Sequence, residues 1–311
     1  MGRSDRSALQ DALQRGVDKM ILLIGRLRYE ARGGLLRVAN GLDSLRLRPR
    51  LRAVPASYEA QVLADLEQEG VHVTKLERLV PEPAARDVLE RARALIGVGS
   101  AQAWSSPWSR ATNSIDLAPE VLIAQAPELY LLGLNERLLD LVQRYLRVPV
   151  AYHGAVLRHS LVDGEHAGAR LWHQDGEDFH VLRMVVYLND VATGGGPFEY
   201  IPRSLGVRYA DFGDARLPLT NDRMREVVPA EQWKRVFGPA GTVVLADTAR
   251  VFHHESLQTQ RERTVIMIGY SSRRPRGREL AMSHFPVERV QAALIQLVPP
   301  TNRGHVFSWR Q

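Results

Sequence analysis

Residues 171–205 read LWHQDGEDFHVLRMVVYLNDVATGGGPFEYIPRSL, and this stretch decides both the fold class and the candidate site. It opens with two histidines and three acids beside aromatic residues. An apolar, β-branched run follows and ends in Leu-Asn-Asp. The GGGP sequence then requires a turn before PFEYIP. Short apolar runs separated by Gly, Pro, Asp and Asn are typical of a β-sandwich or a small barrel.

The same pattern continues on both sides of this stretch. AVLRHSL precedes it, and TVVLAD and TVIMIGY follow it, so we expect a β core over about residues 150–272. Upstream, helical spacing and end signals predict helices over 57–70, 83–98 and 134–146, with VHVT as a short strand. The sequence therefore predicts a mainly β domain with helical additions over residues 54–311.

Two side chains near the start of the stretch share one side of the chain. In an extended segment residues i and i+2 point the same way, so His173 and Asp175 converge. Taken alone, this pair is as consistent with a loop histidine bound to a carboxylate as with half of a metal site. Downstream, ADTARVFHHES (246–256) offers another histidine and RERTVIMIGY an arginine.

Two histidines and one carboxylate with open positions form the facial triad of non-haem Fe(II) oxygenases. An arginine near such a site can bind a carboxylate through two parallel N–H groups. This is what 2-oxoglutarate requires, because its keto-acid end chelates the iron while its distal carboxylate needs a fixed cation.

These motifs, in this order, resemble the phytanoyl-CoA dioxygenase family of Fe(II)/2-oxoglutarate oxygenases. The family pattern is H-x-D, a strand ending in L-N-D, G-P-x-E-x-I-P, a distal histidine and then an arginine, and it covers roughly Tyr58 to Tyr270. The resemblance implies a double-stranded β-helix (a jelly-roll, cupin-like core) flanked by N-terminal helices.

The resemblance also implies the site residues. Iron would be bound by His173, Asp175 and His253, the first histidine of the pair; adjacent strand residues face opposite ways, so His254 would point elsewhere. Arg263 would hold the distal carboxylate of 2-oxoglutarate. Arg261 has the same strand parity and is the alternative.

Two departures from the family pattern concern the cosubstrate pocket. IPRSL stands where members commonly read IPGSH, and HHES stands where many read H-G-S, so Glu255 replaces a small polar neighbour of the cosubstrate. Related halogenases have a small residue in place of the carboxylate ligand. Asp175 is present here, which favours hydroxylation or desaturation.

Other residues have plainer interpretations. Arg183 lies in a strand predicted to be mostly buried, where a charge needs a partner, either the cosubstrate or substrate or a structural acid. His153 and His159 line the barrel or contact substrate. We expect Glu177 and Asp178 to be solvated loop acids or groups that orient His173. We expect Trp172 to be part of the core.

We therefore predict a 2-oxoglutarate-dependent dioxygenase that uses Fe(II) and O2 to hydroxylate a small organic molecule or secondary metabolite, with release of succinate and CO2. Two alternatives remain: a zinc-dependent hydrolase on the same barrel, which would need a general base and no Arg263, and a non-catalytic metal-binding barrel. Substrate specificity would reside in the loops 101–116 and 211–235.

Charge and composition restrict the partners. The chain has 311 residues and a net charge of +6, but residues 1–53 carry +7 and the remainder −1. A basic stripe through the working domain would indicate nucleic acid, and none is present, so we expect no nucleic-acid partner. Residues 1–53 are a basic, amphipathic extension, with apolar residues at helical spacing between Leu9 and Ile24. This extension either contacts a membrane surface or a protein, or packs on the enzyme.

The chain has no cysteine, which excludes disulfides, thiolate metal sites and cysteine nucleophiles. The longest N-terminal apolar run, MILLI, is too short to span a bilayer and is followed by no cleavage site. We therefore expect a cytoplasmic protein, with membrane contact at most peripheral.

Overall fold

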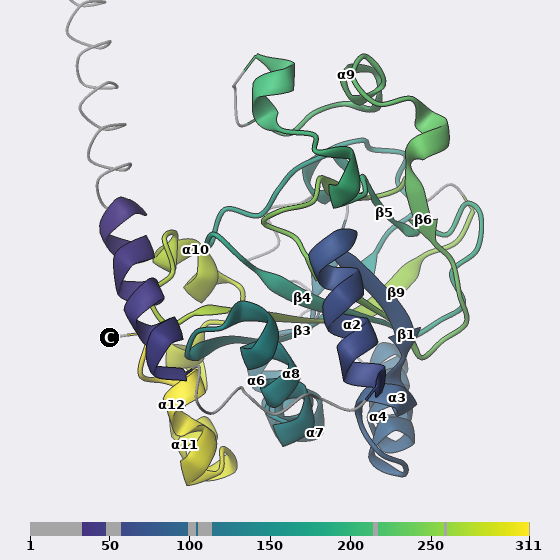
Figure 1. Ribbon diagram of the computed structural model, residues 1–311. Helices are drawn as coiled ribbons and strands as arrows, with labels where there is room; N and C mark the ends of the chain where they lie inside the picture. The colour runs from purple at the N-terminus through teal and green to yellow at the C-terminus, as the bar shows by residue number, and fades with distance from the viewer. Residues whose placement is uncertain are drawn as a thin grey trace, which may run out of the picture.

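The computed structural model describes residues 33–47, 57–98, 104, 114–213, 217–257 and 260–310. It contains two antiparallel β-sheets, and most of its helices lie on the outer side of the larger sheet (Figure 1). The larger sheet has the strand order β1-β7-β4-β9-β3-β2 and the smaller β6-β5-β8. The described strands are β1 (Val71–Lys75), β2 (Ser114–Asp116), β3 (Val150–Ser160), β4 (Leu182–Tyr187), β5 (Phe198–Tyr200), β6 (Lys234–Val236), β7 (Thr242–Asp247), β8 (His253–Glu255) and β9 (Arg263–Ser272).

The predicted fold class is confirmed: the chain is mainly antiparallel β with added helices. Strands β3 to β9 fall between residues 150 and 272. The larger sheet also recruits two strands from upstream. One of them, β1, pairs with β7 so that Val71 lies opposite Ala246, and the other, β2, pairs with β3.

The helices predicted before the β core are present. Between residues 57 and 310 the described α-helices include α2 (Ser57–Gln68), α3 (Leu76–Leu79), α4 (Ala84–Val98), α6 (Pro119–Gln125), α7 (Pro127–Leu132), α8 (Glu136–Leu146), α9 (Asn221–Arg225), α10 (Arg278–Ser283), α11 (Gln291–Leu297) and α12 (Arg303–Val306). Helices α2, α7 and α8 contact strands of the larger sheet (Figure 1).

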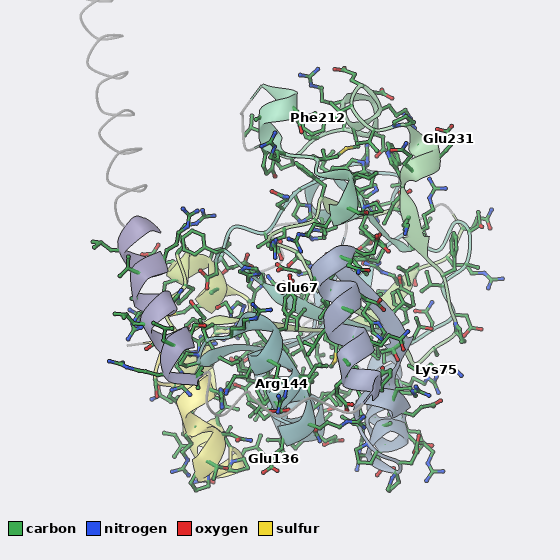
Figure 2. The ribbon with its side chains drawn as sticks, in the orientation of Figure 1. Glu67, Lys75, Glu136, Arg144, Phe212 and Glu231 are labelled. Carbon is green, nitrogen blue, oxygen red and sulfur yellow. The ribbon has the colours of Figure 1, made fainter. Side chains whose placement is uncertain are left out.

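Helix α8 illustrates how the sequence fixes these elements. The Asn135 side chain accepts hydrogen bonds from the backbone N–H groups of Arg137 and Leu138, which caps the first turn. Its apolar residues, at spacings of three and four, are buried. Glu136 is exposed at the start of the helix (Figure 2), and the half-buried Arg144 pairs with Asp140 at 2.6 Å. The chain leaves the helix through Arg147 in the left-handed conformation.

Strands of the larger sheet are buried on both faces, and residue parity decides which face each side chain joins. In β4, Leu182, Met184 and Val186 join the core beneath the helices, whereas Val185 and Tyr187 join a second core beneath the smaller sheet. Each fully buried aliphatic side chain contributes about 1.5–3 kcal/mol. The site lies on the second of these faces.

A helix over residues 33–47 lies at one side of the domain (Figure 1). It is tethered by the Asn40 amide, which donates to Ser272 Oγ at 3.3 Å, and by an ion pair between Asp43 and Arg274. The predicted helix between Leu9 and Ile24 lies outside the described residues, as does most of the predicted loop 101–116.

Within the described part of the chain, every helix is too short or too polar to cross a membrane.

Candidate metal centre

Three potential ligands converge where the two sheets meet. His173 and His253 form an isolated antiparallel bridge in which each backbone N–H donates to the other's carbonyl, at 3.1 and 3.0 Å. Asp175 Oδ1 lies 3.7 Å from His173 Nε2 and 3.9 Å from His253 Nε2. Ligand atoms of all three residues lie within 4.8 Å of one another, which fits one metal ion.

Backbone carbonyls set the orientation of both imidazole rings. His173 Nδ1 lies 2.8 Å from the carbonyl of Leu171, and His253 Nδ1 lies 3.2 Å from that of Val251. We assign the ring proton to Nδ1 in both, because a carbonyl can only accept. The lone pair of each Nε2 is then directed toward Asp175, as a metal ligand requires.

The protonation states also suit a metal. Burial, with the charge of His173 as a second cause, lowers the pKa of His253 to about 3, so this ring is neutral at physiological pH. Burial alone would raise the pKa of Asp175, but Arg183 and the two histidines outweigh it and hold that pKa well below its usual range. The cluster therefore presents the neutral imidazole of His253 and the carboxylate of Asp175 beside the Nε2 atom of His173.

Arg183 fixes the carboxylate from behind. Its Nε donates to Asp175 Oδ2 at 3.0 Å, while its Nη2 donates to Glu177 Oε1 and lies 2.7 Å from His284 Nε2. The partner predicted for this buried arginine is thus found among structural acids, and Oδ1 of Asp175 remains directed at the two histidines.

The prediction that Glu177 and Asp178 are solvated acids is wrong. Their side chains are buried, at 1% and 3% exposure. Glu177 pairs with Arg183 and His284, and Asp178 accepts from the N–H and hydroxyl of Ser272 at 3.0 and 2.6 Å. Both acids are buried because distant segments supply their partners.

The two adjacent histidines have opposite environments. His254 Nε2 lies 2.9 Å from Glu199 Oε2, and its Nδ1 lies 2.9 Å from the carbonyl of Arg170. Its ring packs on Trp172, 3.9 Å between centroids, and Trp172 is fully buried, as expected. His254 therefore faces away from the other two ligands, and His253 completes the cluster.

Arg263 and Arg261, the two candidates for binding the distal carboxylate of 2-oxoglutarate, differ in burial. Arg263 is 4% exposed, opens β9, and lies on the inner face with Val265, whereas Arg261 is exposed. Arg263 Nη1 donates to the carbonyl of Gly196 at 2.7 Å, and its Nη2 donates to Glu255. Arg263 is thus inside the site, but it is already paired with a carboxylate of the chain.

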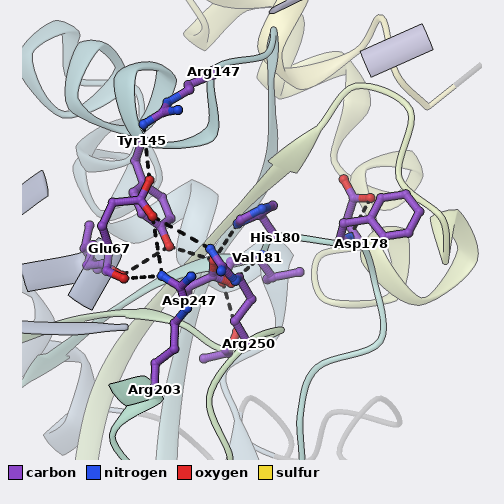
Figure 3. A network of polar contacts seen from close by, with 12 residues as sticks. Glu67, Tyr145, Arg147, Asp178, His180, Val181, Arg203, Asp247 and Arg250 are labelled. Carbon is purple, nitrogen blue, oxygen red and sulfur yellow. Dashed lines mark hydrogen bonds and ion pairs between the residues drawn. The ribbon is translucent and has the colours of Figure 1, made fainter. Parts of the chain in front are cut away.

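A separate network holds the segment 171–181 in place (Figure 3). Asp247, at the end of β7, accepts from the hydroxyl of Tyr145 at 2.7 Å and from the N–H of Val181 at 3.2 Å, and lies 2.7 Å from His180 Nδ1. Next to it, the carbonyl of Thr248 accepts from the N–H of Asp175 at 2.8 Å. The segment carrying two ligands is therefore pinned to the strand end that precedes the third.

Two cavities meet at Asp175. The smaller, about 170 Å³, contains all three candidate ligands together with Arg263 and Glu255. The larger, about 540 Å³, lies on the other side of Asp175 and is lined by Phe179, Tyr209 and three arginines, Arg208, Arg250 and Arg276. The predicted specificity loop 211–235 packs through Phe212, Leu219 and Trp233 on Trp172 and Phe252, behind the ligand strand.

Three residues of the site were not predicted. Arg158 and His284 line the smaller cavity, and Arg170 is fully buried beside Glu255. Arg158 lies in an apolar strand, the signal that singled out Arg183, and could have been found in the same way. Arg170 and His284 lie in segments without regular periodicity, so no local pattern indicates them.

The residues present fit a divalent metal with open coordination positions. Two imidazoles and one carboxylate on one side of a cavity are the donor set that non-haem Fe(II) sites use. Their second atoms are each held by a carbonyl or by Arg183, as functional metal ligands usually are.

No protein-family model matches the sequence, and no curated protein sequence is significantly similar to it. Solved structures do match. The epimerase SnoN, solved with Fe3+, α-ketoglutarate and nogalamycin RO, superposes with a TM-score of 0.50 at 18% identity, over 70% of this chain and 85% of that one. HygX from Streptomyces hygroscopicus, with nickel, 2-oxoglutarate and hygromycin B, gives 0.48 at 17%, over 68% and 86%. EctD from S. alaskensis, with Fe, gives 0.49 at 21%, over 71% and 79%.

The likeness to SnoN establishes the fold class. The chain shares with SnoN a jelly-roll, cupin-like double-stranded β-helix.

Proposed function

We propose that this chain is an Fe(II)- and 2-oxoglutarate-dependent oxygenase that hydroxylates a small organic molecule. The observation that carries the proposal is the convergence of two histidine Nε2 atoms and one Asp175 oxygen on a cavity that also contains a buried arginine. Bound Fe(II), with 2-oxoglutarate and O2, would supply the oxidising power and release succinate and CO2.

We assign the chain, more narrowly, to the phytanoyl-CoA dioxygenase family. The order of motifs over residues 171–205 and 246–263 supports this assignment. So do the positions of the first and last motifs, because H-x-D and the distal histidine meet in space and the following arginine lies in the same cavity.

In this proposal each residue has a defined task. His173, Asp175 and His253 bind the metal, and Arg183 orients the carboxylate. Arg263 binds the distal carboxylate of 2-oxoglutarate. Val185, Phe198 and Met267 form apolar walls that exclude water from the cavity. The larger cavity on the far side of Asp175 is open to a small-molecule substrate, and the residues lining it determine which substrate enters.

A zinc hydrolase is the weaker candidate, because it would require a general base beside the metal-bound water. The two glutamates near the three candidate ligands, Glu177 and Glu255, are each bound to an arginine. Burial would raise the pKa of Glu177, but Arg183 and His284 outweigh it and hold that pKa below its usual value, so Glu177 is a poor proton acceptor.

The test uses single substitutions with a neighbouring control. His173→Ala, Asp175→Ala and His253→Ala should each abolish stoichiometric Fe(II) binding and the 2-oxoglutarate-dependent formation of succinate. His254→Gln should retain metal binding, because that ring faces Glu199. Loss of metal in His254→Gln with retention in His253→Ala would show that the ligand assignment is wrong by one residue. Hydrolysis with Zn(II), without succinate formation with Fe(II), would favour the hydrolase.

We further propose that the N-terminal region contacts an anionic membrane surface. The helix over 33–47 exposes four apolar side chains at spacings of three, four and three, which places them on one face: Leu35, Val38, Leu42 and Leu45, 53–74% exposed. Residues 1–53 carry a net charge of +7, which complements an anionic surface.

A further inference from the structure

The buried pair between Arg263 and Glu255 suggests how this chain selects its cosubstrate. We propose that Glu255 is a built-in competitor: its carboxylate occupies the place on Arg263 that the distal carboxylate of 2-oxoglutarate requires. The inference rests on the proposed function and deepens it. It makes Glu255 a specificity-determining residue that reduces the preference for a dicarboxylic cosubstrate.

The position of Glu255 follows from strand geometry. Glu255 and His253 are two residues apart in β8, so their side chains point to the same face, with Cα atoms about 6.6 Å apart. Both residues line the smaller cavity. A ligand chelating a metal at His253 and extending along the strand would therefore bring its far end to Glu255.

Glu255 takes up part of the Arg263 guanidinium. Arg263 Nη1 donates to the carbonyl of Gly196 and Nη2 donates to Glu255, whereas Nε has no acceptor among the described residues. A bidentate pair with an incoming carboxylate needs two guanidinium N–H groups on one side. The distal carboxylate of 2-oxoglutarate would therefore have to share this guanidinium with the negative charge of Glu255, or displace Glu255 from Nη2.

Glu255 has a second cation to move to. Arg170 is fully buried, and its Nε lies 4.0 Å from Glu255 Oε1 without a hydrogen-bond acceptor among the described residues. Its other two nitrogens are held by Asp163 and by two backbone carbonyls. A small shift of Glu255 toward Nε would satisfy this donor and release Arg263, so displacement leaves no buried charge unpaired.

A third arginine keeps the region positive. Arg158 lines the same cavity and is fixed by two hydrogen bonds to Asp116, at 2.6 and 2.7 Å. Replacing Glu255 by a neutral side chain would leave Arg263 and Arg170 with unused N–H groups in a buried pocket, which strengthens their attraction for an external carboxylate.

The experiment compares two 2-oxo acids of equal length. 2-Oxoglutarate ends in a carboxylate and 2-oxopentanoate in a methyl group, so their affinity ratio measures what the distal carboxylate contributes. A charged hydrogen bond at a dry site is worth roughly ten- to a hundredfold. The readout is calorimetric binding of each acid to the full chain loaded with Ni(II), which needs no turnover.

In the unmodified protein the ratio should be about tenfold or less, because Glu255 competes. Glu255→Gln should raise 2-oxoglutarate affinity at least tenfold and leave 2-oxopentanoate affinity within about threefold. Glu199→Gln is the matched control: Glu199 is also a buried, paired carboxylate, bound to His254 and Arg235, but it lies outside the cavity lining. That substitution should change neither affinity.

In the unmodified protein, an affinity for 2-oxoglutarate well above tenfold that for 2-oxopentanoate would overturn the proposal. This measurement needs no variant, so it decides the matter even if Glu255→Gln fails to fold. Unchanged 2-oxoglutarate affinity in a folded, Ni(II)-binding Glu255→Gln would overturn it as well. A protein that binds Ni(II) but neither 2-oxo acid would instead contradict the proposed function itself, so the two failures are distinct.

Discussion

At the scale of single residues, adjacent side chains of the site face different environments. His253 and His254 are adjacent, yet one faces a carboxylate across a cavity and the other pairs with Glu199 and packs on Trp172. The pleat of a strand produces this contrast, because successive side chains leave on opposite faces. The same rule places Glu255 beside His253 and gives the cavity its internal carboxylate.

Acid should destabilise the metal-free protein through His253. Its folded-state pKa is about 3 and its ordinary value 6.5, so the unfolded chain binds more protons between these values. The contribution of His253 to the free energy of unfolding is fully present above about pH 6.5. It is lost as pH falls toward 3, by up to about 1.4 kcal/mol per pH unit. Between pH 7 and 5.5, the loss in urea unfolding should be about 1 kcal/mol smaller for His253→Gln than for the unmodified chain. Equal losses would contradict this assignment.

Residue types, spacing and motif order predicted which candidate ligands converge, but not the surroundings of the site. His173, Asp175, His253 and Arg263 follow from strand parity and motif order, and the structure brings all four to one cavity. The burial of Glu177 does not follow, because its partner His284 lies more than a hundred residues away. Long-range ion pairs leave no local pattern in a sequence.

At the scale of elements, one irregularity in β3 accommodates the C-terminal region. The register of β3 against β9 shifts between Tyr152 and Gly154, and Gly154 has a φ of +112°. A Cβ there would lie 2.4 Å from Cβ of Phe285, which is fully buried against β3. The missing side chain allows this close approach.

Gly154→Ala should therefore be strongly destabilising. The positive φ and the overlap with Phe285 each cost about 1–3 kcal/mol, so we expect a loss of about 3 kcal/mol or more in chemical denaturation. Gly206→Ala is the control, since Gly206 also has a positive φ (+67°) but nothing lies within 4 Å of its Cβ position. That substitution should cost about 1 kcal/mol. Similar losses in both variants would show that packing against Phe285 contributes nothing.

Periodicity identified three of the longer helices, α2, α4 and α8, and the core strands, but not how the strands pair. Helix α8 was predicted from one apolar face, and β4 and β9 from β-branched runs. The pairing of β1 with β7 joins segments about 170 residues apart, and β2 is three residues long. A strand of three residues carries too few for a periodic signal, so only the assembled sheet reveals β2, whereas β1 was predicted from VHVT.

At the scale of the whole molecule, the helix over 33–47 has two different sides. Asn40 and Asp43 tether one side to the domain, and Arg37 lies 4.6 Å from the centre of the Phe179 ring. The opposite side exposes the four apolar residues named above. An exposed apolar stripe on a docked helix is typical of an interaction surface.

This stripe should bind anionic vesicles. We expect the full chain to cosediment with vesicles of mixed neutral and anionic lipid, more weakly at high salt because ions screen the basic residues. Changing Leu35, Val38, Leu42 and Leu45 together to serine should abolish sedimentation and leave succinate formation unchanged. Leu205→Ser with Leu217→Ser removes exposed leucines elsewhere and is the control. Undiminished sedimentation of the fourfold variant would exclude this surface.

The mutual hydrogen bonds of His173 and His253 have one more consequence. These residues lie 80 positions apart, so a metal bound to both would close a ring of about that length and hold the segment around His173 to β8. In a chain without cysteine, the ion would serve as a removable cross-link. Unlike a disulfide, its stabilising effect would rise and fall with the free metal concentration, so the resistance of the jelly roll to unfolding would reflect the iron supply of its surroundings.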